Sequence, residues 1–379
     1  MRPLFKQLRK AGMDMARLVI AILVVTVGFI VPGRTFGQAT GYTVLELPAA
    51  IGDQVPYRLN NLGNIAGRAY KPLSVGTQAT IWSYGSLQSI LLGTLPGGDY
   101  SFASDINDAG EVVGASNTGS SMVPFIWTAG GGMQRGPMLP GDNGGQALGV
   151  NKYGHVVGYS SGLNGVRAFI WTQSNGIRSL GVLPGGSYSR ARGLNDLDEV
   201  MGTSASFAGD RAVLWAASGN LRNLGTLPGD TSSEATAINN AGDVVGYSKG
   251  PKGMRAFLWT GAAGMKDLGV LSGANLSEGN NSRALDVNGL GVVVGTSTSS
   301  SGDRAFIWTQ GGGMKDLNAT ISPNLGVLLV EAHAINDKGE IVVMGKVTHE
   351  SSGGIVLPEH QDCAPAPPSS FLLIPAASQ

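Results

Sequence analysis

The sequence predicts an all-β fold: a seven-bladed β-propeller of four-stranded antiparallel blades, closed by the N-terminal strand, which completes the last blade. Three observations predict it. A turn containing asparagine recurs seven times, a tryptophan follows six of these turns at a nearly constant distance, and a segment near the N-terminus matches a strand that the last repeat lacks. Repeats of about 40–50 residues with several short strands are typical of propeller blades.

The first element of the repeat is the asparagine turn. Its clearest copy, residues 106–114, reads Ile-Asn-Asp-Ala-Gly-Glu-Val-Val-Gly, and the copies are spaced by 44 to 49 residues. The seven key asparagines are Asn60, Asn107, Asn151, Asn195, Asn239, Asn288 and Asn336. Glycine in such a turn can adopt the positive φ that hairpins require, and we expect each asparagine to cap its own turn through its side chain.

A calcium-binding role is the alternative for this turn. Calcium takes several oxygen ligands, many of them anionic. The position after the key asparagine is Lys152 in one copy and Gly289 in another, and neither side chain can supply a ligand. The cap is therefore the favoured interpretation.

The tryptophans mark the third strand of each repeat. They are Trp82, Trp127, Trp171, Trp215, Trp259 and Trp308. Residues 256–259 read Ala-Phe-Leu-Trp, so both faces of this strand are apolar. A sheet that is apolar on both faces must be covered on both faces, as stacked blades are. We therefore place the tryptophans between blades. A carbohydrate-stacking set is the alternative for the rings, and a β-solenoid or a long sandwich is the alternative architecture.

The two ends of the chain predict how the ring closes. Residues 42–48 match the fourth strand of a repeat, such as residues 265–271, but precede the first strand of their own repeat. The last repeat supplies three strands, the third expected at residues 354–357. The N-terminal strand can therefore complete the last blade and remove an exposed edge. We expect residues 40–362 to form the propeller and residues 363–379 to form a Pro-rich flexible tail.

A tripeptide in the tryptophan strand carries a resemblance to a known family. Residues 167–169, 255–257 and 304–306 each read Arg-Ala-Phe. With the asparagine turn and the tryptophan, this unit resembles the HAF extracellular repeat, named for His-Ala-Phe at that place. The resemblance covers residues 42–357 and implies an extracellular protein with no known activity. The family's histidine is absent here, so no role of that histidine carries over.

The N-terminus predicts export. Basic residues up to Arg17 precede an uncharged run at residues 18–31, and small residues flank Gln38. This run is shorter than the roughly 20 residues that a transmembrane helix needs, and the pattern is typical of a signal peptide. We expect removal of residues 1–39, an extracellular or periplasmic location and no stable membrane span after processing. An uncleaved membrane anchor is the alternative.

Composition limits the partners. Lysine plus arginine equals aspartate plus glutamate at 26 each, so nothing indicates binding to nucleic acid. The single cysteine, Cys363, cannot form an intramolecular disulfide. We expect a monomer whose partner is an unknown extracellular or cell-envelope ligand, either protein or glycan.

The sequence offers no catalytic motif in the setting that its chemistry needs. It contains no His-Glu-x-x-His, no phosphate loop and no EF-hand, and its four histidines are scattered. The pattern Gly-x-Ser-x-Gly occurs at residues 158–162 and 246–250, but both copies belong to the Val-rich strand after an asparagine turn and not to a strand-to-helix elbow. We expect no catalytic residue, metal or cofactor, and favour a non-catalytic binding protein. A secreted hydrolase or lyase with a site on one face of the propeller is the alternative.

Irregular connections predict the binding site. The longest departures from the repeat are residues 272–282, 318–330 and 49–55, which follow the fourth strand of three consecutive repeats once the ring closes. Polar, enlarged loops on a regular scaffold commonly carry binding. We therefore expect a polar patch on one face, with Asp53, Glu278 and Glu331 as its charged members.

Overall fold

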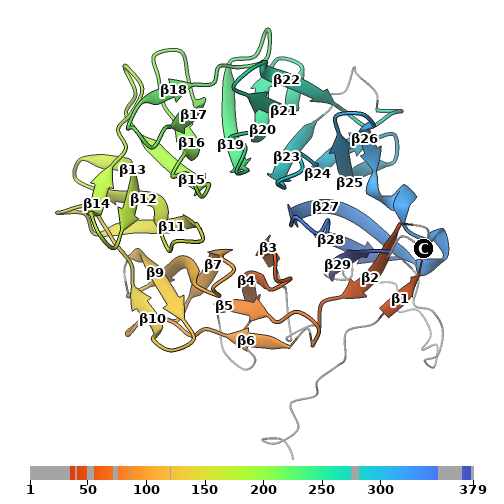
Figure 1. Ribbon diagram of the computed structural model, residues 1–379, viewed down its shortest axis with the longest axis horizontal. Coiled ribbons are helices and arrows are strands. Elements are labelled where there is room, and N and C mark those ends of the chain that lie inside the picture. The colour runs from red at the N-terminus through yellow and green to blue at the C-terminus, as the bar shows by residue number, and fades with distance from the viewer. Residues whose placement is uncertain are drawn as a thin grey trace, which may run out of the picture.

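The computed structural model describes residues 35–38, 41–48, 55–70, 76–86, 88–119, 121–274, 281–348 and 369–376. These residues form seven antiparallel sheets arranged as blades around a central channel (Figure 1). Within the described part the chain is β-structure and turns, apart from the short 3-10 helices η2 (Leu317–Thr320) and η3 (Pro323–Leu325). Among these residues no helix is long and apolar enough to cross a membrane.

Each blade begins at the channel and ends at the rim. The strands of blades 1 to 3 are β3 (Val55–Leu59), β4 (Ile65–Tyr70), β5 (Thr77–Trp82) and β6 (Ser89–Leu91); β7 (Ser101–Ile106), β8 (Val112–Asn117), β9 (Met122–Thr128) and β10 (Gly132–Arg135); and β11 (Gly144–Val150), β12 (Val156–Gly162), β13 (Gly165–Thr172) and β14 (Gly176–Ser179). Those of blades 4 to 6 are β15 (Ser189–Leu194), β16 (Val200–Ser204), β17 (Arg211–Trp215) and β18 (Leu221–Asn223); β19 (Ser232–Ile238), β20 (Val244–Gly250), β21 (Gly253–Thr260) and β22 (Gly264–Gly269); and β23 (Ser282–Val287), β24 (Val293–Ser299), β25 (Gly302–Thr309) and β26 (Gly313–Asp316).

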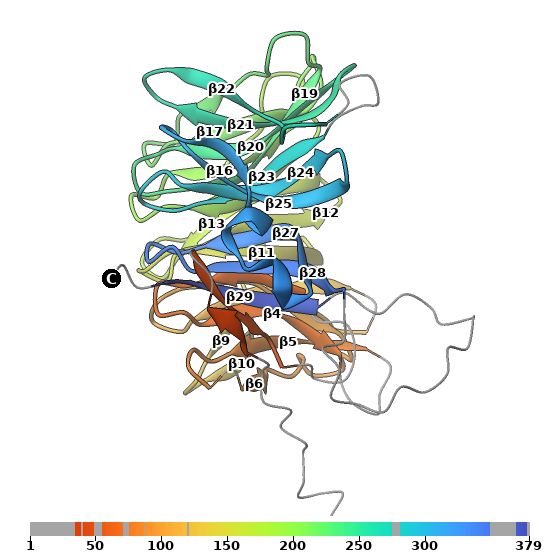
Figure 2. The same ribbon diagram turned by 90° about the vertical axis from the view of Figure 1, so that its right-hand side faces the viewer.

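Blade 7 is built from both ends of the chain. Its strand order is β27 (Val327–Ile335), β28 (Ile341–Val347), β29 (Ser369–Pro375), β2 (Tyr42–Glu46) and β1 (Thr35–Gln38). Strand β2 pairs antiparallel with β29, with Val44 opposite Leu373. Figure 1 shows β29 between β28 and β2, and in Figure 2 the red N-terminal strands lie beside β29. The predicted closure by the N-terminal strand is therefore confirmed.

The third strand of blade 7 differs from the sequence-based expectation. It is β29, which lies inside the segment 363–379 that we expected to be a flexible tail, whereas residues 354–357 lie outside the described residues. The physical reason is composition: Phe371, Leu372 and Leu373 are 0% exposed and fill the blade interface. The preceding prolines and the missing seventh tryptophan conceal this strand in the sequence.

Blade 7 also carries an additional strand at its outer edge. Strand β1 pairs with β2 and lies within residues 1–39, the predicted signal peptide. The six other sheets contain four strands each in the described residues. Cleavage after Ala39 would therefore leave blade 7 with the same number of strands as the other blades.

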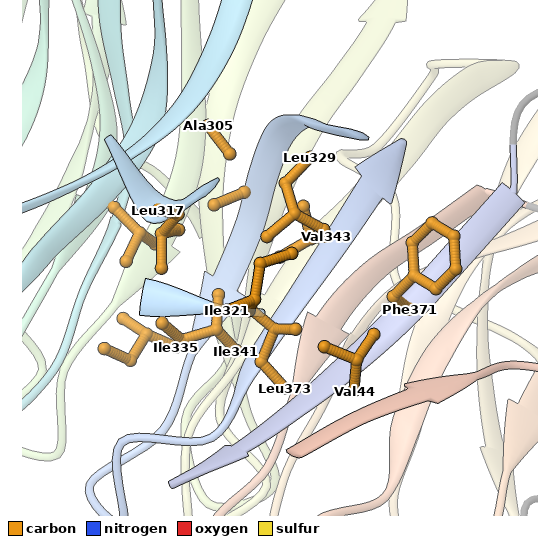
Figure 3. Packing of buried hydrophobic residues seen from close by; sticks show 12 residues of the cluster. Val44, Ala305, Leu317, Ile321, Leu329, Ile335, Ile341, Val343, Phe371 and Leu373 are labelled. Atoms are coloured by element: carbon orange, nitrogen blue, oxygen red, sulfur yellow. The ribbon is translucent and has the colours of Figure 1, made fainter. Parts of the chain in front are cut away.

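The core lies between neighbouring blades. In Figure 3, Val44, Leu329, Val343 and Phe371 of blade 7 belong to one buried cluster with Ala305 of blade 6. The tryptophans belong to such clusters: Trp82, Trp215, Trp259 and Trp308 are at most 4% exposed, while Trp127 and Trp171 are half-buried. They are inter-blade core, as predicted. An aromatic ring of this size contributes several kcal/mol by leaving water.

The innermost strand of every blade contains a β-bulge. In blade 5 the register of β19 and β20 shifts between Ala235 and Ala237, so one residue is unpaired. A few residues away, the carbonyl of Glu234 comes so close to Gly246 that an added Cβ would lie 2.0 Å from it. Glycine is therefore needed in the second strand at that point. A bulge changes the direction in which side chains point, so it determines which side chains face the channel.

Candidate functional site

The key asparagines form a ring at one end of the channel, here called the Asn end. In each copy the side-chain oxygen accepts hydrogen bonds from nearby main-chain N–H groups, as Asn239 does from Ala241 and Asp243 at 3.0 and 2.9 Å. The side-chain amide then donates to the main-chain carbonyl of the next blade's key asparagine, at distances of 2.9–3.2 Å. The asparagines are thus turn caps, as predicted, and they also join the blades.

The opposite end of the channel is lined by the bulge residues. The seven described inner strands place one unpaired residue each at the bulge, three positions before the key asparagine: Tyr57, Ser104, Leu148, Arg192, Thr236, Leu285 and His333. All seven line one cavity of about 370 Å³, together with Arg58, Phe102, Gln146, Tyr159 and Arg190. We call this the mouth cavity. Its size is within the range of sites for small organic ligands.

Arg58 lies between the mouth cavity and a second cavity of about 240 Å³ at the Asn end, and it lines both. From β3 in blade 1, its Nη2 donates to the main-chain oxygen of Thr236 in blade 5 at 3.1 Å. Its Nη1 lies 3.5 Å from the main-chain oxygen of His333 in blade 7. The side chain therefore crosses the channel.

Two half-buried aspartates lie in the electrostatic field of Arg58. Asp105 accepts a hydrogen bond from the N–H of Val150, and Asp286 accepts one from Ile335, both at 2.9 Å and both in the next blade. Burial raises the pKa of Asp105 to about 6, which the charge of Arg58 and the two main-chain N–H groups partly oppose. Burial likewise raises the pKa of Asp286. Both carboxyls are therefore protonated at a higher pH than exposed aspartates are.

His333 and Ser104 present unsatisfied polar atoms to the mouth cavity. The Nε2 of His333 and the Oγ of Ser104 are buried and have no hydrogen-bond partner among the described residues. Glu331 is the nearest acid to His333, but its Oε1 is 3.8 Å from Nε2, which is too far for a hydrogen bond. Burial lowers the pKa of His333, so its imidazole is neutral. Buried polar atoms usually have partners, so two orphans in one cavity indicate a place for a polar ligand.

Arginine–tyrosine stacks surround the same end of the channel. The Arg190 guanidinium lies 5.1 Å from the ring centre of Tyr159 and 5.6 Å from that of Tyr188. Arg68 lies 6.0 Å from Tyr57, and Arg283 lies 5.8 Å from Tyr247. Burial and the nearby Glu234 raise the pKa of Tyr247 to about 12, so that hydroxyl stays protonated. Stacking fixes each guanidinium plane while leaving its N–H groups available.

The predicted site residues are placed only in part. Asp53 and Glu278 lie outside the described residues, as do residues 49–54 and 275–280 of their loops, so their proximity stays a prediction. Glu331 lies in β27, half-buried, near His333.

The third enlarged connection, residues 318–330, has a structural role. Its first helix, η2, begins at the buried Leu317, and Ile321 is also buried in the cluster between blades 6 and 7. The side chain of Asn318 bonds both main-chain groups of Leu329 at 2.8 and 2.9 Å. These contacts fix the segment against the start of β27.

Sequence reasoning missed the residues of the mouth cavity because it concentrated on loops. The available signal was position rather than motif. The third residue before each key asparagine changes from tyrosine to serine, leucine, arginine, threonine, leucine and histidine, while the next residue upstream is alanine in six of the seven copies. A position that differs between the copies of an otherwise regular strand is not constrained by packing. Such a position indicates a side chain at a surface.

Comparisons with known proteins support the fold. No protein-family model matches the sequence, and no curated protein matches it closely enough to indicate a relative. Among solved structures, virginiamycin B lyase from Staphylococcus aureus is similar with a TM-score of 0.54 and 13% identity, over 88% of this chain and 99% of that one. An oligogalacturonate lyase in complex with manganese gives 0.52 and 12%, over 91% and 96%. The β-propeller domain of the Trilobed protease from Pyrococcus furiosus, described as having an open velcro topology, gives 0.50 and 10%, over 76% and 97%.

At these identities the likeness establishes the propeller architecture alone. In the described residues no group of three or more His, Cys, Asp and Glu side chains could hold a metal ion.

Proposed function

We propose that this protein is an exported, non-catalytic binding propeller of the HAF repeat type, and that its ligand occupies the mouth cavity. One observation carries the proposal. Seven bulges direct unlike side chains from seven blades into one cavity, and two of those side chains, Ser104 and His333, have buried polar atoms without partners. A regular scaffold gains no stability from such variety, whereas a binding site needs it.

Binding is favoured over catalysis by the distances within the cavity. A hydrolase or lyase requires a base, a polarising group and a reacting position within reach of one another. The neutral His333 could serve as a base, but Glu331 is 3.8 Å from its Nε2 and does not orient the ring by a hydrogen bond. The catalytic alternative therefore has one candidate base, whose ring Glu331 does not orient by a hydrogen bond.

Export is supported by the basic and apolar N-terminus. The fourth strand of blade 7, β2, begins at Tyr42, so cleavage after Ala39 would leave the closing strand intact. N-terminal sequencing of the secreted protein should begin at Thr40. Recovery of the full-length chain in membranes would favour the anchor instead.

A cavity-filling variant tests the site. Mature protein is titrated against a panel of soluble glycans, cell-envelope polymers and peptides by isothermal calorimetry, and every ligand that binds is retested with Ser104→Trp. Ser218→Trp, at an exposed turn far along blade 4, is the matched control. We expect binding to be at least 10-fold weaker in Ser104→Trp and unchanged in the control.

Three outcomes contradict the proposal. Equal binding by Ser104→Trp and the wild type would place the ligand elsewhere. The absence of any ligand in the panel would count against a binding role. Release of a chemically altered ligand, abolished by His333→Gln, would establish the catalytic alternative.

A further inference from the structure

The chemistry of the mouth cavity is set by polar groups that have no ion-pair or hydrogen-bond partner among the described side chains. Arg190 projects from β15 with an exposed side chain, and no carboxylate of the described residues lies within 4.0 Å of its guanidinium. Arg192, two residues along, does have one, since its Nη2 is 3.7 Å from Glu234. Arg190 is therefore a guanidinium held by two tyrosine rings and available to an anion.

Arg190 differs from Arg58 and Arg192, the other two arginines that line the mouth cavity, because both of those have partners. Arg58 is already bonded across the channel to Thr236 and lies in the field of Asp105 and Asp286. Glu331 lies beside His333. Asp105 and Asp286 line the cavity at the Asn end, and no acidic residue is among the described residues that line the mouth cavity. A monoanion can be paired by Arg190 alone. A planar carboxylate matches the fork of the guanidinium.

Two further groups of the cavity can bond hydroxyls. The Nε2 of His333 and the Oγ of Ser104 lie in blades 7 and 2 and have no partner among the described residues. A hydroxyl can donate or accept, so it can satisfy a neutral imidazole in either tautomer and also a serine. The lining also includes three aromatic rings, those of Tyr57, Phe102 and Tyr159, beside the polar Gln146 and Thr236. Such rings pack against the face of a ligand ring.

We propose that the mouth cavity binds a hydroxylated six-membered ring carrying one carboxylate, with Arg190 pairing the carboxylate and with His333 and Ser104 bonding the hydroxyls. This inference rests on the proposed function, because it names the ligand class of the same site. The chemistry could come from a sugar acid of a cell-envelope glycan or from a hydroxylated aromatic acid. The volume of about 370 Å³ admits one such ring or a pair of linked rings.

Matched probes test the ligand class. D-galacturonate and D-glucuronate represent the sugar acids, and 4-hydroxybenzoate represents the aromatic acids. Galactose, glucose and phenol are the same rings without the carboxylate, and inorganic phosphate is the anion without a ring. We expect at least one acid to bind to the mature protein at least 10-fold more tightly than its neutral counterpart and than phosphate. Binding of a sugar acid or of the aromatic acid identifies which of these two classes supplies the ring.

Substitution of the guanidinium tests its role. In Arg190→Gln we expect the acid to bind at least 10-fold more weakly, with little change for a neutral ring. Arg222→Gln is the matched control, because Arg222 also stacks on an aromatic ring, at 4.6 Å from that of Trp259, but lies in β18 away from the channel. If Arg190→Gln fails to fold, Arg190→Lys keeps the charge without the planar fork, and intermediate affinity is expected.

The failures of the two proposals are distinguishable. A neutral ring that binds as tightly as its acid, or an acid whose binding Arg190→Gln leaves unchanged, overturns the carboxylate inference. If Ser104→Trp still blocks that ligand, the mouth cavity remains the binding site. The absence of binding by every acid probe at 10 mM also overturns the ligand class, while the wider panel still decides the proposed function.

Discussion

The side-chain amide of Asn336 donates a hydrogen bond of 3.1 Å to the main-chain carbonyl of Asn60, 276 residues away in the sequence. This bond closes the ring of key asparagines at the Asn end. At the outer side of the same blade, β2 pairs with β29 and closes the chain a second time. Blade 7 is therefore joined at both its inner and its outer strands, so its contacts determine whether the propeller forms one cooperative unit.

Replacing one key asparagine by aspartate tests the ring of hydrogen bonds. In Asn288→Asp the carboxylate can still accept from the turn N–H groups, but it cannot donate to the carbonyl of Asn336. We expect the free energy of unfolding, measured by urea denaturation, to fall by about 1–3 kcal/mol. In Asn336→Asp the loss should be larger, because the new carboxylate would also face Glu340, whose Oε2 now accepts from the amide at 2.6 Å.

The control for this series is Asn223→Asp. Asn223 lies in β18 and uses its side-chain oxygen to accept from Gly225, a role that aspartate can also fill. Its variant should unfold at the same urea concentration as the wild type. Equal stability of Asn288→Asp and Asn223→Asp would show that the inter-blade bonds add nothing.

Removal of β29 tests the architecture of blade 7. A chain that ends at residue 368 lacks Phe371, Leu372 and Leu373, all 0% exposed, and leaves β2 and β28 without the strand between them. We expect loss of cooperative thermal unfolding, followed by near-UV circular dichroism. A chain that ends at residue 376 is the control and should unfold like the full-length protein. Normal unfolding of the shorter chain would support the flexible tail.

Truncation of a tryptophan tests the role of these rings. Trp259 is 4% exposed and belongs to a buried cluster with Leu227 and Phe257. Trp259→Ala should lower the free energy of unfolding by about 3–5 kcal/mol, because it leaves a cavity between blades. Tyr153→Ala, at a site that is 62% exposed, should change it by less than about 0.5 kcal/mol. A small loss at Trp259 would revive the carbohydrate-stacking interpretation.

The pH dependence of stability tests the burial of Asp105. Its pKa is about 6 in the folded protein and near 3.9 in an unfolded chain. Between these values the folded state holds a proton that the unfolded state has lost, so this group makes the free energy of unfolding fall as pH rises and level off above pH 6. The raised pKa of Asp286 acts in the same direction.

Asp105→Asn removes this contribution. We expect the free energy of unfolding of the variant, minus that of the wild type, to increase by about 2 kcal/mol from pH 4 to pH 7. Urea denaturation at each pH measures both free energies. Asp286→Asn should show the same direction of change, and the double variant the greatest. A constant difference between Asp105→Asn and the wild type over this range would mean that Asp105 titrates as an exposed carboxyl does.

Local sequence patterns determined most of the fold. The asparagine turns, the tryptophan strands and the residues 42–48 each carry their information within a few neighbouring residues, because turn geometry and strand pairing in a meander are local. The number of blades and the N-terminal closing strand could therefore be predicted. Strand β29 could not be predicted, because it follows a Pro-rich stretch and lacks the tryptophan that marks the other third strands.

The candidate site was decided by the tertiary structure. Asp53, Glu278 and Glu331 were chosen as charges in irregular loops, and only Glu331 lies in the described residues, beside the cavity. Tyr57, Ser104 and His333 occur in strands whose sequence does not reveal which side chains face the channel. That direction depends on a bulge, which forms only when the inner strand pairs with the second. Closure of the ring then brings these residues, far apart in the chain, around one cavity.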